Sequence, residues 1–534
     1  MKTNKRFWKS ALASLVCVMG LTQSGVAAAD EPVKGGRLNL VVQPEPPVLN
    51  LGINKLGPTS FVGGKIYEGL VSLSPDLKPL PRLAESWTVS PDSTRYVFNL
   101  RKNATWHDGK PFTADDVIFS FTKFLPATTP RTAMVLNLTE SITALDPHTV
   151  EFKFKKPFPA LMMVLESTGG TIMPAHLYEG VTDYRTAAAN NTIVGTGPFK
   201  VKEWRKGSYI HLVRNENYWD AGKPYLDELY FHVIPDANSR SMAFESGRID
   251  AIRTGDVENF EILRLAENPS VEMTKAGWEY FDPIVYFHIN LRNKPMGDVR
   301  FRQALAHAID RKFIVDTIFN GFGSHLNGPF SNDSPFKDTS VETEFAFDPA
   351  KARALLDEMG LKPDAKGVRT ELRLLPLPYG ETWQRLAEFV REQLQDVGIR
   401  TQLVATDVPG WFQRVTTGDF DLAFNYMYQL GDPAILMSQT YMSEFQFNGS
   451  TASNLGGYEN PAIDELFRKG QSEADFEKRR AIYSEIQKTL SHDVPILWLH
   501  QMVMPTLYNK RVQNLVTTGV GMNENFADVW LKKR

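Results

Sequence analysis

The stretch from residue 372 to 426 alternates between strand and helix patterns, and it constrains the fold more than any other part of the chain. Apolar residues at every second position predict strands at 372–374, 399–403 and 422–426. Apolar residues at helical spacing predict helices at 383–397 and 408–417. Strands joined through a helix in this way lie parallel, with a right-handed crossover. We therefore predict an α/β fold.

The length of the chain requires more than one core. Its 534 residues exceed the roughly 250–300 residues at which a single hydrophobic core stops growing. We expect two lobes, with the chain crossing to the second lobe near residues 277–290, where a strand pattern begins. Apolar residues at helical spacing then predict a helix over 301–309. A helix running into a turn is expected from Phe61 to Leu73.

The first 29 residues have the features of a secretory signal. Four basic residues lie within the first nine positions, and the apolar run at 11–21 is too short to span a bilayer. Three alanines at 27–29 precede Asp30, so we expect cleavage near Ala29. The alternative is an uncleaved anchor. No later run approaches about 18 apolar residues, so no membrane-spanning helix is expected beyond this segment.

Cysteine usage and charge exclude several function classes. Cys17 is the only cysteine and lies within the signal, and Val16 stands where a lipid-attachment site has a small residue. The exported chain therefore has neither disulfide nor thiolate chemistry. Removing the four basic residues takes the formal net charge from −3 to −7. A mildly acidic chain is a poor binder of nucleic acid and has no basic face for anionic lipid.

A compact local unit is predicted between Arg82 and Phe121. Residues 96–100 alternate as a half-buried strand, and 106–112 contain the turn dipeptides Asp-Gly and Lys-Pro. Thr113 begins a helix in which Asp116 can reach back in a capping-box arrangement. The expected apolar face of this helix comprises Val117, Phe121 and Phe124.

Several blocks along the chain carry a family resemblance. They are Tyr67–Leu70, Ala84–Trp87, Trp106–Gly109, Phe112–Val117, Gly195–Phe199, Asn217–Trp219, Asp298–Leu305 and Ala308–Arg311. In this order they resemble the family 5 extracellular solute-binding proteins, which serve ABC importers for dipeptides, oligopeptides, nickel complexes and related solutes. The resemblance implies a periplasmic receptor that works with permease subunits of the inner membrane.

The same resemblance implies a fold and a domain organisation. The expected fold is a two-lobed periplasmic binding protein, type II and cluster C-like, with an extra subdomain in the first lobe. The first lobe would comprise residues 30–278, with the subdomain at about 82–190. The second lobe would comprise 279–495, and 496–534 would return to the first lobe.

Two loops at strand ends are the predicted binding site. In open α/β sheets, ligands bind beyond the carboxyl ends of the strands, which here are the segments 377–381 and 427–432. Both are rich in aromatic, amide and acidic side chains. The Pro-rich loop at 44–58 adds a third segment, which the resemblance places at the cleft. The expected ligand-binding residues are Thr59, Tyr379, Trp411, Tyr426, Tyr428, Gln429 and Asp432. Each aromatic residue could equally be structural, and Trp383 is expected in the core.

Metal and catalytic sites are not expected. The ten histidines contain no HExxH and no paired metal spacing, so no cofactor is predicted. His232 and His288 lie in apolar strands and are interpreted as structural, while His500 lies near a possible cleft strand. No G-x-S-x-G elbow occurs, and the paired acids Asp115 and Asp116 belong to a helix start. No set of residues fills the roles of nucleophile, base and stabiliser.

Two charged anchors of the dipeptide binders in this family are missing. Those proteins hold the ligand amino group with an Asp shortly before Gly-Asp-Pro, where this chain has Tyr428. They hold the carboxylate with an Arg before Pro-Tyr, where this chain has Leu377. Each lost charge-assisted bond costs about 1.5–3 kcal/mol, so a free dipeptide would bind roughly two to four decades more weakly. A longer peptide, or a sugar-derived, opine-like or aromatic solute, fits better.

The sequence therefore predicts a monomeric receptor that closes around a solute without altering it and delivers it to an ABC importer. The alternative from another class is a secreted hydrolase acting on peptides or glycans. A binding protein with a chaperone-like or sensory role is a third interpretation, and a metal chelate is a further possible ligand class.

Overall fold

The computed structural model describes residues 31–341, 345–446 and 449–533. The predicted signal at 1–29 lies outside these residues. Two large sheets organise the described chain, and residues 33–534 form one compact unit by internal contacts. Within the described residues, no helix is both long and apolar enough to cross a bilayer.

The first large sheet has seven strands. In spatial order they are β12 (Val271–Thr274), β19 (Thr506–Asn509), β11 (Ala251–Arg253), β1 (Arg37–Val41), β10 (Glu228–His232), β9 (Tyr209–Arg214) and β8 (Phe199–Arg205). β1 pairs in parallel with both β10 and β11, and the other pairs are antiparallel. Leu38 and Leu40 of β1 are fully buried, as their alternation in the sequence predicts.

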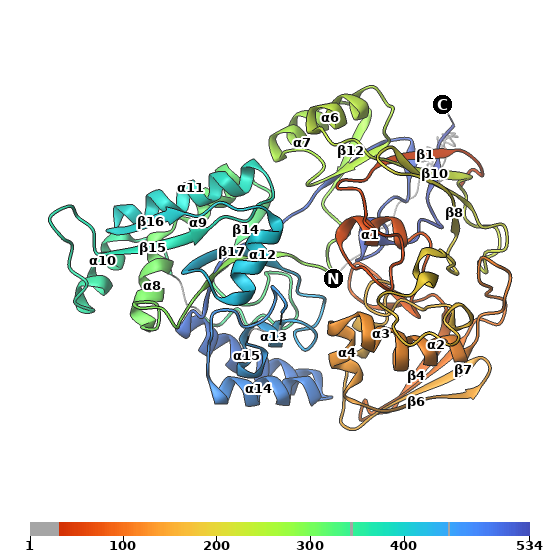
Figure 1. Cartoon of the computed structure of the whole chain (residues 1–534), viewed down its shortest axis with the longest axis horizontal. Coiled ribbons are helices and arrows are strands. Elements are labelled where there is room, and N and C mark those ends of the chain that lie inside the picture. Colours follow the sequence, from red (N-terminus) through yellow and green to blue (C-terminus); the bar gives the residue numbers. More distant parts are fainter. Residues whose placement is uncertain (1–30, 342–344, 447–448, 534) are drawn as a thin grey trace, which may run out of the picture. The chain divides into compact units, whose positions relative to one another are not determined.

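The second large sheet has six strands and contains the predicted strand–helix–strand unit. In spatial order they are β14 (Gly323–His325), β18 (Ile496–Met502), β13 (Ile284–Ile289), β17 (Leu422–Met427), β15 (Thr370–Leu375) and β16 (Ile399–Leu403). β15 is parallel to both β16 and β17. The helix between β15 and β16 is α11 (Glu381–Asp396), which lies along these strands in Figure 1. The prediction of a parallel α/β unit is confirmed.

Helices cover both faces of the second sheet, and each face has its own core. One core contains Val285 and Phe424 with side chains of α11 and α8 (Val299–Ala308). The other contains Ile284 and Met427 with side chains of α13 (Met437–Tyr441), α14 (Pro461–Ser472) and α15 (Phe476–Asp493). Residues 284 and 285 therefore point to opposite faces, as do residues 424 and 427, in keeping with the two-residue period of a strand.

A four-stranded antiparallel sheet forms the extra subdomain. Its order is β4 (Ala84–Val89), β5 (Arg95–Leu100), β7 (Thr149–Phe154) and β6 (Thr139–Asp146). Its helices are α2 (Ala114–Phe119), α3 (Leu125–Thr128), α4 (Pro130–Leu136) and α5 (Leu161–Val164). Asp116 accepts a hydrogen bond from the Thr113 amide at 3.0 Å, as the capping box predicts. A π-helical turn at Ser120–Phe124 follows α2, which the apolar spacing did not indicate.

The remaining elements include one correction. The helices are α1 (Gly57–Gly63), α6 (Ala237–Glu245), α7 (Asn259–Ala266), α9 (Arg311–Phe313), α10 (Pro349–Glu358) and α12 (Val408–Thr417). The helix running into a turn that was predicted from Phe61 to Leu73 is wrong at its end, because the helix stops at Gly63 and Val71–Leu73 forms β2, which pairs with β3 (Pro79–Pro81). At Gly64, which follows the helix, a Cβ would lie 2.0 Å from the carbonyl oxygen of Asn523, so the chain there packs against a segment distant in sequence.

The chain passes between the two large sheets twice. Residues 275–283 connect β12 to β13, and residues 503–505 connect β18 to β19. The change of sheet near the C-terminus therefore comes after β18, beyond the expected boundary at 495. The last strands, β20 (Val512–Gln513) and β21 (Trp530–Leu531), pair with each other.

Three of the family-like blocks meet around one buried carboxylate. Glu68 accepts hydrogen bonds from Tyr218 Oη at 2.8 Å and Trp219 Nε1 at 2.9 Å. Thr196 Oγ1 and Asn525 Nδ2 donate to it as well, each at 3.1 Å. Burial raises the pKa of Glu68, and these donors oppose that effect. The blocks at 67–70, 195–199 and 217–219 thus share a structural role.

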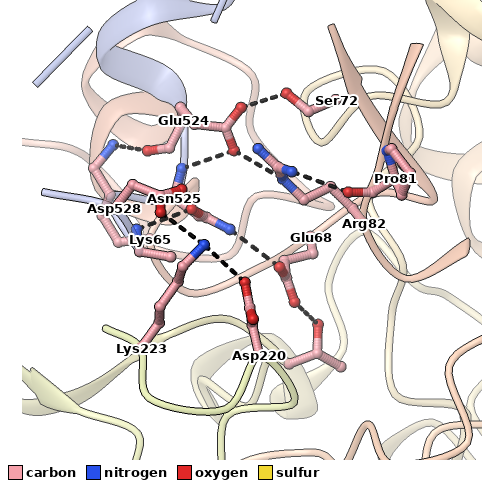
Figure 2. Close-up of polar contacts among 12 residues, drawn as sticks. Lys65, Glu68, Ser72, Pro81, Arg82, Asp220, Lys223, Glu524, Asn525 and Asp528 are labelled. Carbon is pink, nitrogen blue, oxygen red and sulfur yellow. Dashed lines mark hydrogen bonds and ion pairs between the residues drawn. The ribbon is translucent and has the colours of Figure 1, made fainter. Parts of the chain in front are cut away.

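A buried lysine and an ion pair hold the C-terminal segment beside Glu68. Lys65 Nζ donates to the carbonyl oxygens of Met522 and Glu524, each at 2.6 Å. Arg82 pairs with the Glu524 carboxylate at 3.4 Å, and Ser72 donates to the same carboxylate (Figure 2). Because a buried charge is tolerated only when paired, these contacts make the segment after residue 521 an integral part of the first lobe.

Candidate functional site

Three of the predicted site residues form an aromatic cluster at the carboxyl ends of β15 and β17. The ring centroids of Tyr379 and Tyr426 are 6.4 Å apart, and those of Tyr426 and Tyr428 are 5.7 Å apart. Tyr379 is 50% exposed, whereas Tyr426 and Tyr428 are half-buried. We call these three residues the tyrosine cluster.

The parallel pairing of β15 and β17 brings the cluster together. Tyr379 comes after the end of β15, and Tyr426 lies near the end of β17. Gly380, at φ +97°, then allows the turn into α11. Trp383, on the first turn of α11, stacks against Tyr426 at 6.0 Å, and Phe281 packs edge-on against Tyr428 at 5.2 Å. The rings are therefore fixed by their neighbours and present a preformed aromatic surface.

The electrostatic environment keeps the cluster uncharged. The adjacent Tyr428 and burial raise the pKa of Tyr426 well above its ordinary value, and burial raises the pKa of Tyr428 and of Tyr379. The cluster can therefore offer aromatic faces and neutral hydroxyl groups to a ligand at any physiological pH. These groups suit stacking on apolar side chains, sugar rings or cations.

Two other predicted site residues lie in packed cores. Trp411 of α12 is 4% exposed and belongs to the core that covers the α11 face of the second sheet. Thr59 of α1 is fully buried, and its hydroxyl donates to the Val48 carbonyl at 3.0 Å. Thr59 thereby anchors the Pro-rich loop to α1. Neither Trp411 nor Thr59 is among the residues described above as packing against the tyrosine cluster.

The last two predicted residues line a cavity of about 610 Å³. Its walls come from both connections between the sheets, from Asp76, Leu77 and Met163 of the first lobe, and from 333–336, 429–433 and 474–479 of the second. We call it the hinge cavity. Its volume lies within the roughly 300–1,000 Å³ range of small-molecule sites.

Gln429 and Asp432 differ in what they offer to this cavity. Asp432 forms a bidentate ion pair with Arg479, with both bonds at 2.6 Å, and both side chains are buried. Its carboxylate is thus already neutralised within the protein. Gln429 is 7% exposed, and its Nε2 has no hydrogen-bond partner.

The cluster and the cavity lie on opposite sides of one strand end. Tyr426 packs with the α11 core, whereas Met427 packs with the α13–α15 core. The backbone N–H of Gln429 donates to the Phe281 carbonyl oxygen at 2.7 Å, which continues the extended pairing of β17 with β13. Side chains in extended backbone alternate, so Tyr428 is on the cluster side and Gln429 on the cavity side.

The hinge cavity also contains a perturbed carboxylate. Asp282, in the first connection, is half-buried, and burial together with the nearby Asp333 raises its pKa to about 6. Ser331 Oγ donates to Asp282, and Gln501 Nε2 donates to it at 2.9 Å; these bonds oppose the shift.

The part of the chain that the structure describes has no evident metal centre. No group of three or more His, Cys, Asp or Glu side chains is arranged there to hold a metal ion. His500 is fully buried against Phe319 at 4.2 Å, and burial lowers its pKa to about 3. His288 is likewise buried, with its pKa lowered to about 4.

Two mixed sheets joined by two connections, with aromatic side chains at the strand ends, define a two-lobed binding protein of the periplasmic type. The model of the bacterial extracellular solute-binding proteins, family 5 (middle), matches residues 78–448. The chain therefore belongs to this family, and the sequence-based assignment of family and fold is confirmed.

Three known proteins illustrate the likeness. The probable D,D-dipeptide-binding periplasmic protein of Escherichia coli K12 is 29% identical over 444 residues, which are 81% of each chain. NikA from Brucella suis in complex with Fe(III)-EDTA is 25% identical with a TM-score of 0.81, covering 93% of this chain and 100% of that one. AgaA from A. tumefaciens R10 in complex with agropinic acid is 26% identical with a TM-score of 0.79, covering 93% and 99%.

Sequence reasoning overlooked most of the hinge cavity. Trp278, Asp282 and Phe336 line it but carry no motif. One signal was available, because the expected crossing between lobes contains the run Trp278–Asp282, which is unusually aromatic and acidic for a connection. The segment 331–336 gives no such signal, because only the folded chain brings it to the first connection.

Proposed function

We propose that this protein is the periplasmic solute receptor of an ABC importer, which encloses a peptide or another small organic solute and releases it unaltered to permease subunits of the inner membrane. The tyrosine cluster carries this proposal. It supplies a preformed aromatic surface at the strand ends where ligands of open α/β sheets bind. Family membership supports a binding role rather than a catalytic one.

The site favours a solute other than a free dipeptide. Leu377, at the position of the carboxylate anchor in dipeptide binders, is 1% exposed and apolar. Residue 428 offers a neutral phenol where an amino-group anchor would be anionic. Solutes held by stacking, such as a longer peptide, a sugar-derived or an opine-like compound, fit this surface better than a zwitterion with two closely spaced charges.

Closure of the lobes is the proposed mechanism. The lobes are those predicted from the sequence, residues 30–278 and 279–495 with a C-terminal return to the first, except that the return is placed after Met502 because β18 (Ile496–Met502) belongs to the second sheet. The segments 275–283 and 503–505 act as hinges. A solute drives closure only through contacts that exist in the closed form. The tyrosine cluster lies close to the first hinge, since Phe281 packs against Tyr428.

Tyrosine variants test the site. The solute is first identified by native mass spectrometry of protein purified without denaturation, and its affinity is then measured by calorimetry. Aromatic pairs contribute about 0.5–1.5 kcal/mol beyond burial, so Tyr426→Ala and Tyr428→Ala should each weaken binding at least about two- to tenfold. Tyr209→Ala, on a half-buried tyrosine of β9, is the matched control. Unchanged affinity in both cluster variants would refute the assignment.

A turnover assay separates the receptor from the rival hydrolase. The purified protein is incubated with the identified solute, and the mixture is followed by mass spectrometry. A receptor returns the solute unchanged, whereas formation of a product would refute the proposal. The same preparation tests the proposed cleavage near Ala29 by intact mass and the proposed monomer by light scattering.

A further inference from the structure

We propose that the hinge cavity is a second binding site, which takes a small organic cation with an apolar or aromatic body. This site is separate from the tyrosine cluster and does not depend on the identity of the transported solute.

The charge of the cavity wall is the first observation. Asp432 and Arg479 neutralise each other at 2.6 Å. The other charged residues of the lining are three acids and one base: Glu279, Asp282, Asp333 and Lys275. Asp76 also lines the cavity, but it pairs with Lys78 outside it. The wall therefore has an excess of negative charge, which disfavours anionic ligands and favours cations.

Asp282 and Asp333 are held close together by a shared donor. Gln501 Nε2 donates to Asp282 Oδ1 at 2.9 Å and to Asp333 Oδ2 at 2.7 Å. The Gln501 Oε1 atom accepts from the backbone N–H of Asn332 at 3.0 Å, which fixes the orientation of the Gln501 side-chain amide. Two carboxylates can accept about eight hydrogen bonds between them, so an ammonium group beside them would gain several acceptors and would offset their mutual repulsion.

Gln429 is an independent indication of a ligand. It lines the cavity, it is more than nine-tenths buried, and its Nε2 lacks a partner. Leaving a buried donor unsatisfied destabilises a protein. A ligand that carries a hydroxyl or carbonyl oxygen besides its ammonium group would satisfy this donor.

The remaining wall is suited to an apolar body. Trp278 and Phe336 line the cavity from the first connection and the second lobe, and Phe336 packs with Phe476 at 5.5 Å. Aromatic faces next to carboxylates are the usual surroundings of bound organic ammonium groups. A metal ion fits less well, because no group of three metal-ligating side chains is arranged among the described residues.

Because the cavity is bounded by both lobes, a ligand bound there would affect how the lobes are arranged. Its walls include Leu77 and Met163 of the first lobe, Phe336 and Phe476 of the second, and parts of both connections. A bound cation would contact all of these segments and would stabilise the arrangement of lobes in which the cavity exists.

Calorimetry with a matched pair of probes tests the proposal on the full exported chain. The probes are tyramine, which combines an ammonium, an aromatic ring and a hydroxyl, and 3-(4-hydroxyphenyl)propionate, which replaces the ammonium with a carboxylate. We expect tyramine to bind at least tenfold more tightly than the acid. Asp282→Asn and Asp333→Asn should each weaken tyramine at least about tenfold, and Tyr426→Ala should change it by less than twofold.

Three results would overturn the proposal. One is the absence of tyramine binding at millimolar concentration, and another is equal binding of the acid. The third is loss of tyramine binding in Tyr426→Ala with no effect in either Asp variant, which would place the cation at the tyrosine cluster. Unfolding midpoints of all variants show whether each is folded, and the two Asp positions provide independent tests. Failure of these tests leaves the tyrosine test of the transported solute unaffected.

Discussion

Replacing Asp282 by Asn should make the protein more stable at neutral pH and flatten its dependence on pH. Burial and Asp333 raise the pKa of Asp282 from 3.8 to about 6. The folded chain thus favours the protonated carboxyl of Asp282. The contribution of this group to the free energy of unfolding is fully present below about pH 3.8, and it is lost as the pH rises through about 6. A shift of roughly two units corresponds to about 3 kcal/mol, and partial exposure of the side chain reduces this to about 1–3 kcal/mol.

Asn is the appropriate replacement because it suits the backbone and keeps one of the two hydrogen bonds. Asp282 has φ +41°, a left-handed conformation that Asn tolerates better than most residues. The single side-chain oxygen of Asn can accept from Ser331 or from Gln501, which both donate to Asp282 in the parent. The variant therefore removes the charge at the cost of one hydrogen bond.

The assay is urea unfolding followed by tryptophan fluorescence between pH 4 and pH 8. The free energy of unfolding of Asp282→Asn, minus that of the parent, should become more positive as the pH rises from 4 to 6.5. Asp338→Asn is the control of opposite sign, since hydrogen bonds from Ser340 and Ser484 lower the pKa of Asp338 to about 2. That group stabilises the fold above its unfolded pKa. A pH-independent difference for Asp282→Asn would refute the reasoning.

Three further predictions concern stability. Asp432→Ala should lower the free energy of unfolding by about 3–5 kcal/mol, measured in urea, because it leaves a buried arginine unpaired; a loss under 1 kcal/mol would contradict this. Gly195→Ala should prevent normal folding by circular dichroism, because a Cβ there would lie 1.9 Å from the Ile66 carbonyl oxygen, whereas Gly57→Ala has nothing within 4 Å and should fold normally. Trp411→Ala should cost about 3–5 kcal/mol as a core truncation, and an effect on solute affinity alone would show that it belongs to the site.

Local periodicity was sufficient to predict the strand–helix–strand unit of the second sheet. The helix predicted at 408–417 is α12 (Val408–Thr417), and the unit at 372–403 has the expected parallel pairing. One face of α11 and of α12 is buried in the core as the apolar spacing predicts, so local pattern and tertiary burial agree. The prediction from Phe61 to Leu73 was wrong at its end because contacts distant in sequence decide that region: Gly64 must approach the backbone at Asn523.

The candidate site was predictable only in part, for a related reason. The rule that ligands bind beyond the carboxyl ends of strands needs only the strand boundaries, and it led to the prediction of Tyr379, Tyr426 and Tyr428, whose rings the structure brings together. It could not distinguish Trp411, whose helical position makes it core, from a surface aromatic residue. Nor could it indicate that Asp432 has Arg479 as a partner, since the two are brought together only by the packing of α15.

The positions of the motifs explain why this sequence indicates a family more readily than a ligand. The blocks around Glu68 are recognisable because a buried carboxylate needs several donors, and Thr196, Tyr218 and Trp219 supply them from separate segments. Replacing any one of these residues removes a donor from a buried carboxylate, which costs stability whatever the solute. The residues of the tyrosine cluster take no part in this network. If they bind the solute as proposed, the chemistry of the solute is to be sought in the segments 377–379 and 426–428, which carry no motif, and in variants there that alter binding while the Glu68 network stays intact.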